Sequence, residues 1–438
     1  SLSRGFFYAK YEMKMIEALY SLYLKHPQIS IDTRSISKDC IFFALKGDNF
    51  NANEFAHTAL GNGAAYAIVD EEKFVLDERC FLVDNVLETL QELARHHRRR
   101  IKCPVLAITG SNGKTTSKEL LYRVLQQKYI TTATKGNYNN HIGVPLSVLS
   151  IPAHTEFAII EMGANHIGEI DFLCNIAMPE YGVITNVGKA HLEGFGSLEG
   201  VLEAKTELYR YIDKRNGVLF IKDNQNNLLE KRAEGTKFFT YGSLEKSTYN
   251  IKFIEAQPKV VVSYENKLIN SQLIGDYNFD NIALSIAIGL HFKVDKEHIK
   301  NALELYVPTN NRSQIVNTAA NTILLDAYNA NPMSVEKAIL TLSSLEHENK
   351  MIILGDMFEL GQESKKEHIK IINLCLSHGF SNVMLVGELF SAVNKTSYKS
   401  YRTTKELYAN LNVVQIKDAF ILIKGSRGMK LEQLVNNL

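Results

Sequence analysis

A short segment rich in glycine, with one lysine, could bind the phosphates of a nucleotide. Residues 109–116 read T-G-S-N-G-K-T-T, directly after an apolar strand predicted over residues 105–108 and at the start of a predicted helix. Glycines let the backbone wrap a polyphosphate, and the amides of a helix N-terminus point at the anion. Lys114 would neutralise phosphate charge, and the Thr115 hydroxyl would help to bind Mg²⁺. The alternative is a glycine turn with a solvated lysine. The predicted nucleotide-binding residues are Gly110, Ser111, Asn112, Gly113, Lys114, Thr115 and Thr116.

This segment departs from the general phosphate loop, G-x-x-x-x-G-K-[ST], at its first position. Ile108 stands where that pattern has its first glycine, which disfavours a generic kinase or ATPase. An N-K-x-D motif for guanine recognition is also missing, because Asn394 and Lys395 are followed by Thr396 and Ser397. A GTPase switch is therefore not expected.

Two more side chains could bind a cation at the same sheet edge. Glu161 follows an apolar strand predicted over residues 157–160, and His191 follows another predicted over 182–184. The carboxyl ends of strands are where a doubly wound sheet binds ligands, and a carboxylate suits Mg²⁺. The alternatives are a glutamate that faces solvent and an ordinary loop histidine. Lys205, on its sequence context alone, is a solvated helix lysine.

The composition narrows the class of protein. The 438 residues include 49 Lys and Arg against 48 Asp and Glu, and this balance disfavours a broad nucleic-acid-binding face. The longest apolar runs are far short of the ~20 residues that span a bilayer, and the first residues do not read as a secretory signal. Five scattered cysteines, never in a C-x-x-C pair, argue against disulfides and structural zinc. We expect a soluble cytosolic protein without membrane insertion.

The elements that must position these residues alternate between strand and helix. Short apolar runs at 29–31, 41–45, 65–69 and 81–83 precede a predicted helix over 86–99, whose end carries a basic cluster at 95–100. We interpret that cluster as a solvated helix C-terminus rather than a phosphate grip. Three α/β domains with largely parallel sheets are expected, over residues 1–100, 101–310 and 311–438. Predicted strands of the second and third domains cover 105–108, 157–160, 182–184, 218–221, 323–325, 351–354, 383–386 and 420–423. A polar, irregular stretch is expected over 224–267, and a helix over 278–290.

Ordered motifs along the chain resemble those of the Mur ligases, the ATP-dependent amide-forming enzymes of peptidoglycan precursor synthesis. The T-G-S-N-G-K-T-T form is similar to that family's ATP loop. The further motifs are the segments 136–145 (GNYNNHIGVP), 160–163 (IEMG), 186–193 (NVGKAHLE), 203–207 (EAKTE) and 276–281 (DYNFDN). Together they extend over roughly residues 30 to 430.

The outer parts of the chain narrow the resemblance to one branch of the family. Residues 326–332 (DAYNANP), 354–361 (LGDMFELG) and 424–427 (KGSR) resemble the branch that adds D-alanyl-D-alanine to UDP-N-acetylmuramoyl-tripeptide. The D-N-P-R motif of the diaminopimelate-adding branch is absent. Residues 32–34 (DTR) and 42–47 (FFALKG) look like the UDP-sugar domain. Asn311 stands where the family has a glycine before Arg312.

The resemblance implies a fold and a set of residue roles. The expected fold has a UDP-sugar-binding α/β domain, a central phosphate-loop ATPase-like domain and a C-terminal Rossmann-like domain. Lys114, Glu161, His191 and Lys205 would be catalytic, and Thr115, Glu161, His191 and a carbamylated Lys205 would hold two Mg²⁺ ions. Asn278 and Asn281 would face adenine, although Asn278 could instead cap a helix. Arg312 would touch phosphate and Asp326 the ribose. The implied substrate-binding residues are Asp32, Thr33, Arg34, Lys46, Gly47, Asn137, Asn140, Tyr328, Asn329, Asn331, Lys424 and Arg427.

The resemblance also implies the reaction. A tripeptide carboxylate would attack the γ-phosphate of ATP, and the amine of D-alanyl-D-alanine would then displace phosphate from the acyl phosphate. The two domains would close around these small substrates, and a monomer is expected. The third peptide residue could be lysine or diaminopimelate. The alternatives are a sister ligase that adds one amino acid, and a nucleotide-binding scaffold without ligase activity.

Overall fold

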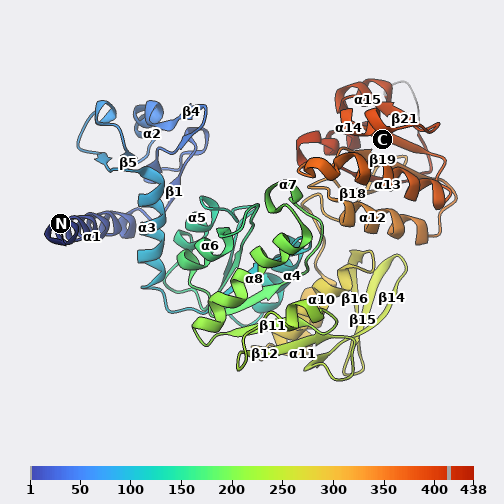
Figure 1. The fold of residues 1–438 in the computed structure, drawn as a ribbon, viewed down its shortest axis with the longest axis horizontal. Coiled ribbons are helices and arrows are strands. Elements are labelled where there is room, and N and C mark those ends of the chain that lie inside the picture. Colours follow the sequence, from blue (N-terminus) through green and yellow to red (C-terminus); the bar gives the residue numbers. More distant parts are fainter. Residues whose placement is uncertain (1, 412–415) are drawn as a thin grey trace.

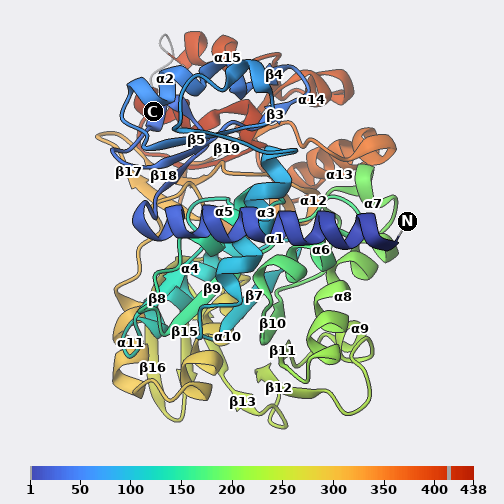
Figure 2. The same cartoon turned by 90° about the vertical axis from the view of Figure 1, so that its left-hand side faces the viewer.

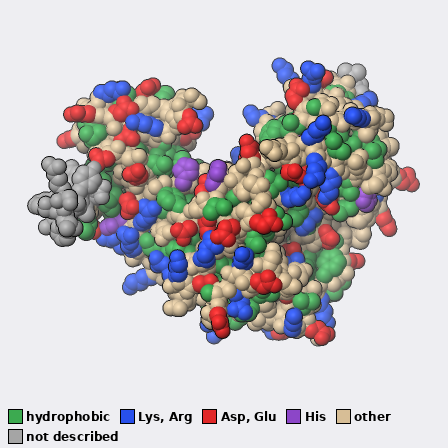
Figure 3. Space-filling view, in the orientation of Figure 1, with side chains coloured by type: hydrophobic (Ala, Val, Ile, Leu, Met, Phe, Trp, Pro, Cys, Tyr) green, Lys and Arg blue, Asp and Glu red, His purple; other side chains and the backbone are tan. Residues whose placement is uncertain are grey.

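A computed structural model describes residues 2–411 and 416–438, with side chains from residue 13 onward. The chain forms three α/β units built on separate sheets, which we call the N-terminal, central and C-terminal units (Figure 1). The N-terminal and C-terminal units stand on either side of the central one and leave a hollow between them (Figure 3). The three-part, mostly parallel α/β architecture expected from the sequence is confirmed.

The N-terminal unit carries a four-stranded parallel sheet in the order β1-β2-β5-β6. The four strands predicted here and the predicted helix over 86–99 are confirmed to within two residues at each end. Helix α1 was not foreseen from the sequence. It crosses the outer side of α3 (Figure 2). The elements are α1 (Leu2–Lys25), β1 (Ile29–Ser30), β2 (Ile41–Phe43), β3 (Lys46–Gly47), β4 (Phe50–Asn51), α2 (Ala56–Gly61), β5 (Tyr66–Val69), β6 (Cys80–Leu82) and α3 (Val86–Arg98).

Helix α3 joins the N-terminal unit to the central one. Leu90 and Leu93 belong to an apolar cluster that also contains central residues. At the helix end, Arg98 is only 5% exposed. Its guanidinium donates to the Ala177 carbonyl oxygen over 2.7 Å and pairs with Glu180 over 2.7 Å. The interpretation of the basic cluster as a solvated helix end is therefore wrong for Arg98, because its charge satisfies the C-terminal carbonyl of a neighbouring helix.

The central unit is a seven-stranded sheet in the order β13-β12-β11-β10-β7-β9-β8, and every pairing is parallel. Alternate residues of β7 face opposite sides. Val105 and Ala107 pack in one apolar cluster, and Leu106 and Ile108 pack in another. Helices thus cover both faces, as predicted. The elements are β7 (Val105–Thr109), α4 (Lys114–Leu125), β8 (Thr131–Ala133), α5 (Gly143–Leu149), β9 (Phe157–Glu161), α6 (Glu169–Ala177), β10 (Tyr181–Ile184), α7 (Leu192–Phe195), α8 (Leu198–Lys214), β11 (Val218–Lys222), α9 (Asn226–Leu229), β12 (Lys237–Gly242) and β13 (Tyr249–Asn250).

The stretch predicted to be polar and irregular, residues 224–267, instead contains several strands. It holds β12 and β13 and most of a three-stranded antiparallel sheet. In β15, Val260 and Val262 are buried and the residues beside them are exposed or partly exposed, so only one face of this strand packs on the core. The elements are β14 (Lys252–Ala256), β15 (Lys259–Tyr264), β16 (Lys267–Ile274), α10 (Asn278–His291) and α11 (Lys296–Glu304).

The C-terminal unit has a six-stranded sheet in the order β17-β18-β22-β19-β20-β21, in which only β17 is antiparallel. Apolar clusters cover both faces. Across the described residues, no helix is both long and apolar enough to cross a membrane. The elements are β17 (Gln314–Asn317), β18 (Thr322–Asp326), α12 (Pro332–Ser344), β19 (Lys350–Gly355), α13 (Ser364–Ser377), β20 (Val383–Val386), α14 (Glu388–Val393), β21 (Lys399–Tyr401), α15 (Thr404–Leu411) and β22 (Phe420–Lys424).

Candidate active site between the central and C-terminal units

A cavity of about 640 Å³ lies where the carboxyl ends of the central strands face those of β18 and β22. Within the described chain, none of its lining residues precedes Ser111, so the N-terminal unit does not contribute to it. Most of the predicted site residues are brought together here: Ser111, Asn112, Gly113, Lys114, Thr115, Thr116, Asn137, Asn140, Glu161, His191, Asn278, Asn281, Arg312, Asp326, Tyr328, Asn329, Asn331, Lys424 and Arg427.

The predicted phosphate loop runs from the end of β7 into helix α4. Gly110 has φ 138°, and a Cβ there would lie 2.0 Å from the Thr185 hydroxyl, so only glycine fits. Gly113 has φ 81° and immediately precedes α4. The Ser111 hydroxyl donates to the Gly188 carbonyl oxygen over 3.0 Å. These contacts hold the loop against the segment that follows β10, with the amides of α4 at the cavity.

Lys114 lies across this loop. Its Nζ donates to the Gly110 carbonyl oxygen over 2.6 Å and lies 3.4 Å from that of Ser111. Burial lowers the pKa of Lys114, the nearby Glu161 carboxylate raises it, and the Arg312 guanidinium lowers it. Arg312 lines the same cavity as Lys114, so the segment before β17 brings a second cation to the phosphate loop's side of the molecule.

Glu161 is 1% exposed and gathers polar partners from three segments. The Thr115 hydroxyl donates to its two carboxylate oxygens over 3.2 and 3.0 Å, and the Asn139 side-chain amide donates over 2.8 Å. The ammonium of Lys118, also buried, lies 4.0 Å away. Neither Asn139 nor Lys118 was predicted as a site residue. The phosphate-loop motif ends at Thr116 and does not include Lys118, although Lys118 lies about one helical turn after Lys114.

This arrangement fits a Mg²⁺ ion that is held by few protein oxygens. The described residues hold no group of three or more His, Cys, Asp or Glu side chains able to bind a metal on their own. Mg²⁺ is commonly bound by one or two carboxylates together with substrate phosphates and water. Here the buried Glu161 carboxylate and the Thr115 hydroxyl, which lies just after the phosphate loop, can supply the protein oxygens.

Lys205 is not a solvated helix lysine. It is 2% exposed on helix α8, and its Nζ lies 3.3 Å from the Ala164 carbonyl oxygen and over the ring of Phe195. Burial, with the nearby Lys114 cation, lowers the pKa of Lys205 to about 7. A substantial fraction of this amine is therefore neutral near pH 7. It lies beneath the cavity and does not line it.

His191 lines the cavity and contacts the C-terminal unit. It adopts φ 52°, and its Nδ1 pairs with the Glu359 carboxylate, whose pKa this contact lowers. Two residues earlier, Lys189 pairs with Glu367 over 2.7 Å. Both acidic partners were missed from the sequence, because nothing in the spacing of Glu359 and Glu367 relates them to residues 168 and 178 positions earlier.

The two predicted adenine-facing asparagines are buried side by side at the start of α10. The Asn281 amide nitrogen donates to the Asn278 side-chain oxygen over 2.8 Å, and its own oxygen accepts from Ser117 over 2.9 Å. The Asn278 amide nitrogen donates back to the Ile274 carbonyl oxygen over 2.8 Å. The alternative of a helix cap by Asn278 is wrong, because it is the first residue of α10 and Tyr277 occupies the cap position.

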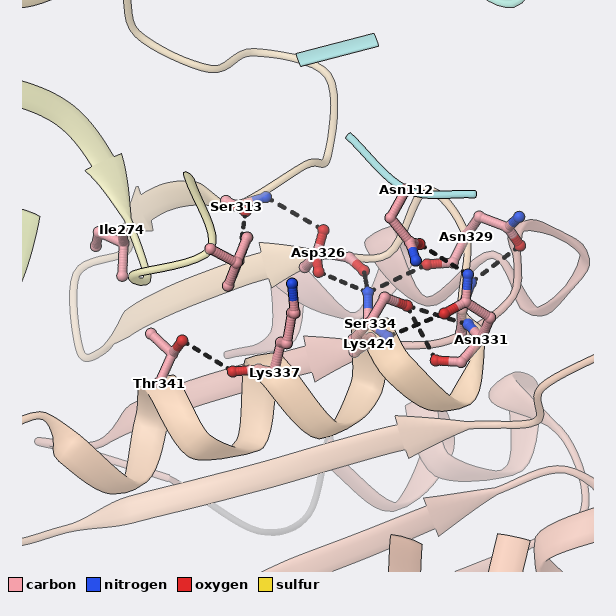
Figure 4. Close-up of polar contacts among 12 residues, drawn as sticks. Asn112, Ile274, Ser313, Asp326, Asn329, Asn331, Ser334, Lys337, Thr341 and Lys424 are labelled. Carbon is pink, nitrogen blue, oxygen red and sulfur yellow. Dashed lines mark hydrogen bonds and ion pairs between the residues drawn. The ribbon is translucent and has the colours of Figure 1, made fainter. Parts of the chain in front are cut away.

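On the opposite side, Asp326 ends strand β18 and faces the cavity (Figure 4). Its carboxylate accepts from the Lys424 Nζ over 2.6 Å and from the Ser313 amide over 3.2 Å. The fully buried Lys424 also lies 3.2 Å from the Asn329 carbonyl oxygen, so its ammonium organises the 326–331 segment. Asn331 caps α12 and donates to the Asn112 side-chain oxygen over 2.7 Å.

Arg312 and Arg427 converge on Tyr328 at the same side of the cavity. Their guanidinium carbons lie 3.8 and 5.0 Å from the ring centroid. Before Arg312, Asn311 adopts φ 55° in the left-handed region. Asparagine tolerates that region almost as glycine does, so the replacement of the family's glycine keeps the turn.

The predicted UDP-sugar residues lie on the N-terminal unit and not at the cavity. Asp32 and Arg34 pair with each other over 2.7 Å. Lys46 pairs with Asp70 and Glu71 over 2.8 and 2.9 Å, while Thr33 and Gly47 lie in the adjoining turn and hairpin. These residues follow β1 and β2 of the N-terminal sheet, and none of them lines the cavity.

Comparisons with known proteins agree along nearly the whole chain. The family model "Mur ligase middle domain" matches residues 108–289, and "Mur ligase, glutamate ligase domain" matches 311–427. UDP-N-acetylmuramoyl-tripeptide–D-alanyl-D-alanine ligase of Bacillus subtilis is 33% identical over 94% of this chain and 92% of its own. The enzyme of the same name from Escherichia coli is 30% identical over 94% and 93%.

Solved structures show the same relationship. The crystal structure of MurF from Acinetobacter baumannii superposes with a TM-score of 0.82 at 30% identity, covering 94% of this chain and 93% of that one. MurF ligase of Thermotoga maritima in complex with ADP superposes with a TM-score of 0.80 at 27% identity, covering 94% and 96%.

Proposed function

Because the chain belongs to the Mur ligase family, we propose that it joins D-alanyl-D-alanine to UDP-N-acetylmuramoyl-tripeptide at the expense of ATP. The products are UDP-N-acetylmuramoyl-pentapeptide, ADP and phosphate. The observation that carries this proposal is the bond from Asn331 to Asn112, which brings the D-A-Y-N-A-N-P segment against the phosphate loop over 2.7 Å. The relatives with which the chain shares 30–33% identity over 93–94% of its length carry this activity in their names.

The first step brings together two anions, the tripeptide carboxylate and the γ-phosphate. Lys114, Arg312 and the amides at the start of α4 all face the same end of the cavity, and they supply the positive charge that this encounter requires. The carboxylate oxygen attacks phosphorus and ADP leaves, which gives an acyl phosphate. Alignment of the two reactants within one cavity would lower the barrier further.

The second step replaces phosphate by the amine of D-alanyl-D-alanine. Asn329, Asn331 and Arg427 lie on the C-terminal side of the cavity and are proposed to bind this dipeptide. Arg427 suits the free carboxylate because its planar fork binds two oxygens. The amine nitrogen forms the amide bond to the acyl carbon, and the carbon–oxygen bond to phosphate breaks.

Two Mg²⁺ ions and a carbamate on Lys205 form the finer part of the proposal. Thr115 and Glu161 would hold one ion, and His191 with a carbamylated Lys205 would hold the other. Bound Mg²⁺ neutralises phosphate charge. Carbamate formation needs a neutral amine, and the pKa of about 7 for Lys205 provides one. This buried lysine is the observation that favours the modification.

Each of the three parts of the chain would then have its own binding role. Residues 1–100 are proposed to bind the UDP-sugar through Asp32, Thr33, Arg34, Lys46 and Gly47, residues 101–310 to bind ATP, and residues 311–438 to bind the dipeptide and close over the nucleotide. Asn137 and Asn140, which line the cavity, would contact the peptide. A cytoplasmic monomer remains our prediction.

The test is ATP-dependent phosphate release with UDP-N-acetylmuramoyl-tripeptide, D-alanyl-D-alanine and Mg²⁺, each omitted in turn, with the product weighed by mass spectrometry. Release that needs every component and yields the pentapeptide supports the proposal. Activity only with a shorter UDP-muramyl peptide and one amino acid would assign a sister ligase instead. ATP binding without turnover on any acceptor would leave a nucleotide-binding scaffold.

The carbamate has its own test, independent of turnover. Protein equilibrated with ¹³C-bicarbonate should show a carbamate carbon resonance that is absent from Lys205→Arg, because a guanidinium offers no neutral amine at these pH values. A spectrum identical for the two proteins would remove the carbamate from the proposal and leave the ligase assignment intact.

A further inference from the structure

Two cationic side chains of the cavity share one aromatic ring. Arg312 comes from the segment between α11 and β17, Tyr328 follows β18, and Arg427 follows β22. The guanidinium carbon of Arg312 lies 3.8 Å from the ring centroid of Tyr328, and that of Arg427 lies 5.0 Å away. One Arg427 nitrogen also donates to the Tyr328 hydroxyl over 2.9 Å.

Neither guanidinium forms an ion pair with a carboxylate anywhere in the described part of the chain, and the buried Nε of Arg312 has no hydrogen-bond partner there. Two cations on one ring repel each other, and the negative face of the ring offsets only part of that repulsion. An anion bound at one arginine relieves the repulsion felt by the other. The arrangement is therefore suited to two anionic groups bound together.

We propose that Tyr328 is a positioning residue that couples the ATP site to the dipeptide site. Its ring orients Arg312 towards the nucleotide phosphates, and its hydroxyl orients Arg427 towards the dipeptide carboxylate. A nucleotide bound at Arg312 fixes the shared ring, and the fixed ring and its hydroxyl hold Arg427 in place, so nucleotide binding strengthens dipeptide binding through this ordering. This inference rests on the proposed function, since it takes the two anions from that reaction.

Two substitutions separate the ring from the hydroxyl. Tyr328→Phe keeps the ring and deletes only the bond to Arg427, so the KM for D-alanyl-D-alanine should rise about two- to tenfold while the KM for ATP changes less than about twofold. Tyr328→Leu removes the ring as well, and both KM values should rise, each about three- to thirtyfold. Tyr401→Phe is the matched control, because it also loses one tyrosine hydrogen bond in the C-terminal unit, to Asn410, far from the cavity lining.

The coupling is measured directly as the Kd for D-alanyl-D-alanine with and without a non-hydrolysable ATP analogue. Wild type and Tyr401→Phe should bind the dipeptide more tightly in the presence of the analogue, and Tyr328→Leu should lose that difference. A uniform fall in kcat with both KM values unchanged would make Tyr328 merely structural and overturn the inference, as would equal KM changes in Tyr328→Phe. A wild type without ligase activity would instead refute the proposed function. If Tyr328→Leu does not fold, Tyr328→Phe alone decides.

Discussion

The side-chain amide of Asn331 donates to the side-chain oxygen of Asn112 over 2.7 Å, which ties the first turn of α12 to the phosphate loop. The same Asn331 caps α12, with its own oxygen accepting from the Ser334 amide over 2.9 Å. One residue therefore begins helix α12 of the C-terminal unit and also contacts the predicted phosphate loop.

Substitution of Asn331 separates these two tasks. Serine keeps a good helix cap but cannot reach Asn112, so Asn331→Ser should raise the KM for ATP about two- to tenfold with an unchanged melting temperature. Alanine also loses the cap, and Asn331→Ala should cost about 1 kcal/mol of stability in addition. Steady-state kinetics and thermal melts check both. An Asn331→Ser enzyme with the wild-type KM for ATP would show that the hydrogen bond to Asn112 does not contribute to ATP binding.

The burial of Lys205 should lower the stability of the protein in a pH-dependent manner. Its pKa falls from 10.5 to about 7 on folding, so between those values the unfolded chain binds a proton that the folded chain lacks. Stability therefore rises with pH across that window, and the penalty is greatest below about pH 7. In bicarbonate-free buffer, Lys205→Met should melt higher than wild type at pH 6, with the difference vanishing near pH 10.5. The same variant should be inactive. Equal melting curves at pH 6 would contradict this.

Glu161→Gln tests the proposed magnesium position. The amide keeps the shape but loses the charge that faces Thr115 and Lys118, so the rate should fall about 100-fold or more, and the remaining activity should need more Mg²⁺. Glu156→Gln is a suitable control, because Glu156 precedes the same strand at its other end and its carboxylate accepts a hydrogen bond from the Ile130 amide. A Mg²⁺ titration of the initial rate distinguishes them. A Glu161→Gln rate within tenfold of wild type would exclude the role.

The Lys189–Glu367 pair should stabilise the contact between the central and C-terminal units. Lys189 is partly exposed and Glu367 is buried, and the carboxylate raises the pKa of the lysine. Lys189→Met leaves a buried carboxylate without its cation and should destabilise the protein by about 1 kcal/mol, a value that allows for solvent screening. Lys189→Met with Glu367→Gln should recover much of that loss. Chemical unfolding of the four proteins in a double-mutant cycle measures the coupling, and additive effects would refute it.

Buried strands and periodic helices of this fold follow from the sequence, and half-exposed elements do not. β7 and β9 are continuous apolar runs, so their positions could be predicted within a residue. β15 lies in a stretch rich in polar residues and buries only the first and third of its three valines, and α1 packs only one face against α3, so neither was predicted. Average hydrophobicity along the chain does not identify an element that has one buried face and one face exposed to solvent.

The candidate site divides in the same way. The phosphate loop and Glu161 could be placed because their roles depend on local order after a strand. Lys118, Glu359 and Glu367 could not, because their partners lie on other elements and only the tertiary fold defines them. Lys205 is the extreme case, since its local sequence is that of a surface helix and its burial arises entirely from packing near Phe195 and Ala164.

The buried end of α3 makes the two joints of the chain unequal. Around residue 98 the apolar core continues from the N-terminal unit into the central one. Cleavage of the chain there would expose the apolar surfaces of α5 and α6 and give an insoluble fragment. The stretch after α11 is the opposite, with Leu305 79% exposed and Val307 59% exposed, and little interior passes through it. Limited proteolysis should therefore cut in the exposed stretch after α11 and release the C-terminal unit intact, while the N-terminal and central units stay together.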